Sequence, residues 1–149
     1  MKDRKMGLIY ADIEIINSEE LGMARRGFID IDEIKRIHIN MLVDTGSYML
    51  AINENIQAYL QLPFITTRSA RLANENSIEC DVVGPVLLRF KNRTATCNAI
   101  VLPGNAEPLL GAIPLEEMDV VINPIRQELT VNPDSPDMAS TKLKQLATA

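Results

Sequence analysis

Short runs in which apolar and polar residues alternate recur along most of this chain, and they favour a fold built from β-strands. We expect strands at residues 9–15, 27–32, 37–43, 66–72, 77–83, 86–90, 94–102, 120–123 and 127–131. Such alternation lets each strand bury one face and expose the other. Because turn-forming residues separate the runs at close spacing, the sequence predicts an all-β fold whose strands form a closed, barrel-like sheet or a sandwich.

Two segments are expected to be short helices. Asn53 can cap a helix that ends before Pro63, and its apolar residues share one face. Pro114 suits the first turn of a second helix that continues to Met118. The connection at residues 17–22 is rich in turn formers, so we expect a loop there.

A chain of 149 residues has room for one ordinary domain. We assign residues 1–132 to this domain. Residues 133–149 are rich in Pro, Ser, Thr and Lys, and they are expected to form a mobile polar tail.

Charge and hydropathy limit the partners of the chain. Its formal charge of −5, with 4% aromatic residues, gives it no electrostatic reason to bind nucleic acid. No apolar run approaches the ~20 residues that span a bilayer, and the charged first residues do not resemble a signal peptide. We therefore expect a cytoplasmic protein without membrane or nucleic-acid partners.

The cysteines and the single histidine offer little chemistry. Cys80 and Cys97 stand apart without metal-ligand spacing, and they are expected to be small buried residues. His38 excludes any two-histidine metal motif, and it lies on the polar face of an expected strand. We expect no metal and no cofactor, so any catalysis should come from carboxylates.

One carboxylate stands out at residues 41–47. An apolar strand ends at Asp44, which enters a tight turn through Thr45 and Gly46. Glycine permits a close backbone approach that a side chain would block. Taken alone, this pattern is also that of an ordinary Asx turn.

The surrounding sequence adds three features in a fixed order. The segment VDTGS at residues 43–47 resembles the active-site motif of the aspartic proteases. A hairpin with a small, polar tip at residues 73–77 lies where that family carries its flap. The sequence LLG at residues 109–111 resembles the second signature, and a short helix and a closing strand follow it. The chain looks like the single-lobe, retropepsin-type branch, in particular its small bacterial members, over residues 7–132.

This resemblance implies the retropepsin fold and an aspartic-type endopeptidase that acts on peptides or proteins. The family needs two catalytic aspartates, and this chain has one usable Asp-Thr-Gly sequence. The second carboxylate must then be Asp44 of another copy, so the resemblance implies a two-fold homodimer with the site on its axis. A catalytically idle module for dimerisation or peptide binding stays open as the alternative.

The resemblance also assigns roles around the catalytic turn. The two Asp44 carboxylates activate a water molecule, and Thr45 directs its hydroxyl to the backbone of its twin. Gly46 lets the substrate approach, and Ser47 donates a hydrogen bond to the carboxylate. Because this hydrogen bond favours the charged form, we expect an acidic pH optimum.

Two further segments receive roles by resemblance. Asn74, Glu75 and Asn76 form the tip of a flap that closes over the substrate, although retroviral flaps are glycine-rich at this place and this one is not. Leu110 and Gly111 lie behind the site, and Gly111 allows the strand to cross behind the catalytic turn.

Overall fold

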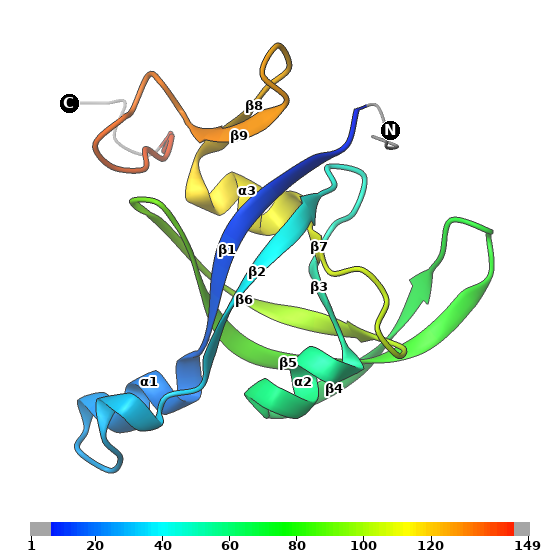
Figure 1. Ribbon diagram of the computed structural model, residues 1–149, viewed down its shortest axis with the longest axis vertical. Helices are drawn as coiled ribbons and strands as arrows, with labels where there is room; N and C mark the ends of the chain where they lie inside the picture. Colours follow the sequence, from blue (N-terminus) through cyan, green and yellow to red (C-terminus); the bar gives the residue numbers. More distant parts are fainter. Residues whose placement is uncertain (1–6, 145–149) are drawn as a thin grey trace, which may run out of the picture.

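Nine β-strands, three α-helices and one 3₁₀-helix make up residues 7–144, the part of the chain that the computed structural model describes (Figure 1). The strands are β1 (Ile9–Asn17), β2 (Arg36–Val43), β3 (Leu50–Asn53), β4 (Phe64–Arg71), β5 (Ser77–Phe90), β6 (Arg93–Leu102), β7 (Leu109–Leu110), β8 (Val120–Asn123) and β9 (Glu128–Val131). The helices are α1 (Ser18–Arg25), the 3₁₀-helix η1 (Ile31–Glu33), α2 (Glu54–Leu60) and α3 (Ala112–Met118). Expectations for residues 1–6 and 145–149 lie outside the described residues.

Six strands pair in a closed ring. The order is β1-β2-β7-β3-β6-β5, and β5 pairs again with β1. The β2–β7 and β3–β6 pairs are parallel, and the other pairs of the ring are antiparallel. The long strand β5 also pairs with β4 along its first half, so the β4–β5 hairpin projects from the ring. The expected all-β fold with a closed, barrel-like sheet is confirmed.

The alternating runs produce this ring because their apolar residues face one interior. The buried cluster includes Ile13 and Ile15 of β1, Met41 of β2 and Leu88 of β5, all with no exposed surface. Helix α3 adds Met118 to the same cluster. Burial of each such side chain stabilises the fold by about 1.5–3 kcal/mol. Among the described helices, none is both long and apolar enough to cross a membrane.

Both expected helices are present. Asn53 caps α2, and its side-chain oxygen accepts a hydrogen bond of 2.9 Å from the backbone N–H of Ile56. Pro114 lies in the first turn of α3, where the missing N–H costs nothing.

The prediction of a loop at residues 17–22 is wrong, because α1 begins at Ser18. Its N-cap is Asn17, whose side-chain oxygen accepts a 3.0 Å hydrogen bond from the N–H of Glu20. Two glutamates in the first turn stabilise the helix, because their negative charges lie near the positive end of the helix dipole. Capping thus outweighs the turn-rich composition of this segment.

Two strand predictions need correction. Residues 27–32 form no strand: Gly27 adopts a left-handed backbone with φ of +81°, and η1 follows. Residues 77–83 and 86–90, expected as separate strands, form the single strand β5. The ladder shifts register between Val83 and Val86, so the turn residues at 84–85 produce a bulge instead of a break.

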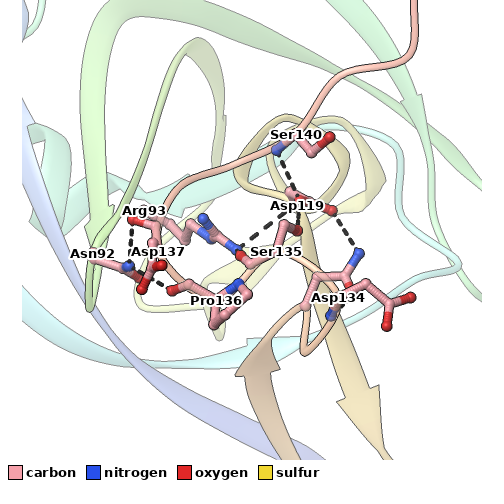
Figure 2. Close-up of polar contacts among 9 residues, drawn as sticks. Asn92, Arg93, Asp119, Asp134, Ser135, Pro136, Asp137 and Ser140 are labelled. Carbon is pink, nitrogen blue, oxygen red and sulfur yellow. Dashed lines mark hydrogen bonds and ion pairs between the residues drawn. The ribbon is translucent and has the colours of Figure 1, made fainter.

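The sequence predicts a mobile tail after β9, but this segment packs against the domain (Figure 2). The Asp119 carboxylate, at the end of α3, accepts hydrogen bonds from the Ser135 hydroxyl at 2.6 Å and from the Asn132 amide at 3.0 Å. It also accepts one from the backbone N–H of Ser140 at 2.9 Å. These three bonds tie residues 132–140 to Asp119.

A buried arginine strengthens this attachment. The side chain of Arg93 has no exposed surface, its guanidinium donates to the carbonyl of Ser135, and it lies 3.9 Å from the Asp119 carboxylate. The amide of Asn92 donates to two more carbonyls, at residues 136 and 137 (Figure 2). Because a buried cation is costly without partners, the docked segment compensates part of this charge.

These contacts lower the pKa of Asp119 from its ordinary 3.8 to about 2. The hydrogen bond from Ser135 has the largest effect, followed by those from Asn132 and Ser140, and the charge of Arg93 adds a smaller one.

We expect Asp119→Asn to lower the melting temperature at neutral pH and to reduce the acid sensitivity of the fold. A carboxylate whose pKa is depressed in the folded state stabilises it above the unfolded pKa of about 3.9, and this stabilisation is lost as the pH falls to about 2. The melting temperatures of variant and wild type, followed from neutral pH to about pH 2, should therefore converge at the acid end. Asp134→Asn is the control, because this side chain points away from Asp119 (Figure 2). A difference that stays constant with pH would contradict the prediction.

Candidate functional site

Asp44 follows directly after β2, at the start of the loop that leads to β3. Val43 pairs with Leu110 of β7 in a parallel ladder. The backbone N–H of Asp44 continues this ladder and donates to the carbonyl of Leu110 at 3.0 Å. The backbone of Asp44 is thus fixed from behind by a buried strand.

The two oxygens of the Asp44 carboxylate have different hydrogen-bond donors. The backbone N–H of Gly46 donates to Oδ1 at 3.0 Å, and the hydroxyl of Ser47 donates to Oδ2 at 2.9 Å. The backbone N–H of Ser47 also donates to the carbonyl of Asp44 at 3.0 Å. Hydrogen bonds to a carboxylate are stronger than neutral ones, so they orient the group well. Asp44 is nevertheless half-exposed, and its carboxylate is open to a reactant.

Gly111 lies against the back of this loop. A Cβ atom at this position would lie 2.8 Å from the carbonyl oxygen of Ser47 and 2.9 Å from the carbonyl carbon of Tyr48. The next two backbone N–H groups, of Ala112 and Ile113, donate to the carbonyls of the same two loop residues at 2.8 and 3.0 Å. Only glycine allows this approach, and it lies behind the site together with the fully buried Leu110.

The front of the loop faces away from the barrel interior. Thr45 and Gly46 are exposed at the turn, and the side chain of Tyr48 is 66% exposed. The structure thus brings together Asp44 with its expected supports Gly46 and Ser47, and it leaves Thr45 available to a second molecule.

The expected flap is the hairpin between β4 and β5. Asn74, Glu75 and Asn76 form its tip and are exposed. The N–H of Leu72 donates to the carbonyl of Asn76 at 2.8 Å, which closes the turn. Glu75 adopts a left-handed backbone with φ of +71°, a conformation that glycine accommodates more easily.

The stem of the hairpin, below its tip, contacts the loop that runs from Asp44 to Met49. Ala70 of β4 and Ile78 of β5 pack with Met49 of the loop around the buried Cys80. Arg68 of β4 reaches the same loop, and its Nη1 lies 3.3 Å from the sulfur of Met49. Neither Met49 nor Arg68 stands out in the sequence, because their contact depends on the pairing register of the hairpin.

The thiols and the histidine do not form a nucleophilic site. Burial raises the pKa of Cys97 to about 12, and burial together with Asp81 raises that of Cys80, so both thiols stay protonated at neutral pH. His38 is 69% exposed on the polar face of β2, as expected, and lies 3.7 Å from the Glu14 carboxylate.

A shallow cavity of about 240 Å³ lies beside this histidine, lined by Asp12, Glu14, His38, Arg89, Phe90 and Lys91. The pair Glu14–His38 lies five ladder positions from Val43, so the cavity is separate from Asp44. Its central carboxylate, Glu14, is already paired with Arg89 at 3.3 Å and with Arg36 at 3.4 Å.

Within residues 7–144, no cluster of three or more His, Cys, Asp or Glu side chains could hold a metal ion. Neither the models of known protein families nor the curated proteins contain a match to this sequence.

We expect Gly111→Ala to lower the free energy of unfolding by about 1–3 kcal/mol, because the added methyl group meets backbone atoms that cannot move without shifting the loop after Asp44. Urea denaturation measures this change. The control is Gly22→Ala in α1, where a Cβ atom meets nothing within 4 Å. Alanine should stabilise that helix by about 0.5–1 kcal/mol. Equal effects of the two substitutions would show that Gly111 does not support the loop.

Proposed function

We propose that this protein is an aspartic-type endopeptidase in which two copies of the chain each supply one Asp44. The supporting observation is the geometry of the catalytic turn. A half-exposed carboxylate is held by the Gly46 N–H and the Ser47 hydroxyl, and a glycine-bearing strand crosses behind it. This arrangement agrees with the resemblance of the sequence to the retropepsin-type proteases, and the retropepsin fold is part of the proposal.

In the proposed mechanism the two Asp44 carboxylates share one proton, because two carboxylates about 3 Å apart cannot both be ionised. The ionised carboxylate takes a proton from a water molecule, whose oxygen attacks the scissile carbonyl carbon. The other carboxylate gives its proton to the carbonyl oxygen. The C–N bond then breaks, the nitrogen receives a proton from the pair, and the diol oxygen returns one. The pair again holds a single proton.

A homodimer is required because one chain supplies one such carboxylate. The exposed Thr45 would donate its hydroxyl to the backbone of the partner loop and so hold the two turns together. The substrate is a peptide or protein segment, bound in extended form between the loops and the β4–β5 hairpins. The proposed location of this activity is the cytoplasm.

We expect Asp44→Asn to reduce peptide hydrolysis to background while the fold is retained, because an amide cannot take a proton from water. The assay is cleavage of a denatured protein mixture, with and without a transition-state analogue that inhibits aspartic proteases. Asp81→Asn is the matched control, since Asp81 is an exposed carboxylate on β5, and it should keep the activity. Retention of even a tenth of the activity by Asp44→Asn would exclude Asp44 as the catalyst.

The same variant tests the homodimer. When Asp44→Asn chains are mixed in ninefold excess with wild-type chains, random pairing leaves about a tenth of the wild-type chains in fully wild-type dimers. The activity per wild-type chain should fall accordingly. Activity that is unaffected by the excess, from a protein that sedimentation shows to be monomeric, would refute the shared site. Binding of the inhibitor without any cleavage would instead indicate an idle binding module.

We expect Ser47→Ala to shift the alkaline limb of the pH–rate profile to higher pH and to change the acid limb less. The Ser47 hydroxyl donates to Oδ2 of Asp44 and so stabilises the charged carboxylate. Without this bond the shared proton is lost at a higher pH, and the two limits belong to the coupled pair. The acidic optimum of the wild type should therefore broaden towards neutrality. If both limbs stay in place, the hydroxyl does not act on the pair.

A further inference from the structure

We infer that Arg68 determines the substrate specificity of this site, by selecting peptides that carry a carboxylate side chain close to an apolar residue. This inference rests on the proposed function and adds the class of substrate to it.

The pairing register of the β4–β5 hairpin determines the face of the hairpin on which the Arg68 side chain lies. Arg68 pairs with Cys80, and Ala70 pairs with Ile78. Residues at every second position share one face of a strand, so these four side chains lie on the same face. Cys80 is buried and Ala70 and Ile78 are partly buried, so this face of the hairpin is turned towards the loop that carries Met49.

The positive charge of the Arg68 guanidinium is not balanced by a carboxylate of the described residues. Its contact with the catalytic loop is the 3.3 Å approach of Nη1 to the sulfur of Met49, and a thioether is a weak acceptor. Among the described residues, no carboxylate lies within 4 Å of it. A guanidinium has five N–H groups arranged to bind a carboxylate with two parallel hydrogen bonds. Arg68 therefore presents free donors beside Met49, which follows Ser47 by two residues in the chain.

The nearby arginine of the same strand differs. Arg71 lies three positions further along, on the opposite face of β4, and its guanidinium is 4.0 Å from the carboxylate of Glu75. Two arginines of one strand thus have the same charge but face different surroundings, which provides a matched control.

The surface beside Arg68 is apolar. Met49, Ile78, Leu102 and Leu109 are partly buried around a small core of Ala51, Cys80 and Ile100. An apolar side chain of the substrate can cover this surface, while an acidic side chain on the same face of the extended peptide reaches Arg68. The selected sequence then has an acidic residue two positions from an apolar one.

The test uses peptide pairs that differ only by Glu or Gln two positions from an apolar residue next to the cleaved bond. We expect the wild type to cleave the Glu peptide with a kcat/KM about tenfold higher, and this ratio should fall at high salt. Arg68→Met should bring the ratio close to one, and Arg68→Glu should invert it. Arg71→Glu should leave the ratio unchanged. Binding of the same peptides to the Asp44→Asn protein, measured by fluorescence anisotropy, gives a second readout that needs no catalysis.

The outcomes separate this inference from the proposed function. Cleavage without preference for Glu, or an equal loss of preference in Arg68→Glu and Arg71→Glu, overturns the role of Arg68 and leaves the protease intact. Arg68-dependent binding of the Glu peptide without cleavage by the wild type supports the role of Arg68 and overturns the protease. Absence of both binding and cleavage overturns both.

Discussion

Two backbone hydrogen bonds flank the loop that begins at Asp44 and join it to the strand behind it. The N–H of Asp44 donates to the carbonyl of Leu110, and the N–H of Ala112 donates to the carbonyl of Ser47. Between these bonds lies Gly111, whose missing side chain lets the two backbones approach. The same short strand β7 links β2 to β3 in the ring, and α3 starts directly after it. Closure of the barrel and placement of the carboxylate therefore depend on one close backbone contact.

Much of this arrangement can be predicted from the sequence, because the relevant signals are local. Alternation predicts β1, β2 and β6, since each of these strands has one buried and one more exposed face along much of its length. Asn53 predicts the start of α2 through its own side-chain hydrogen bond. The turn at Asp44 is also local, because its donors, Gly46 and Ser47, lie within three residues.

Other features could not be predicted, because their causes are distant in the chain or absent from its apolar pattern. Helix α1 buries none of its residues, so no apolar periodicity predicts it. The capping residue Asn17 is the local signal for its start. The Arg93–Ser135 contact joins residues 42 positions apart, and each of them alone resembles an ordinary polar residue of a turn or tail. The contact of Arg68 with Met49 follows only once the register of β4 on β5 is known.

The proposed chemistry requires the fold to persist at acidic pH, and the attachment of the C-terminal segment at Asp119 bears on this requirement. In the proposed pair, a shared proton on two carboxylates requires a pH at which one of them is protonated. A fold that depends on ionised carboxylates weakens in the same range. The Asp119 carboxylate itself stays ionised in the folded state down to about pH 2, because its hydrogen bonds lower its pKa, while its contribution to stability declines below the unfolded pKa of about 3.9. The carboxylate that fixes residues 133–140 thus keeps its charge at pH values where the proposed catalytic pair gains its proton.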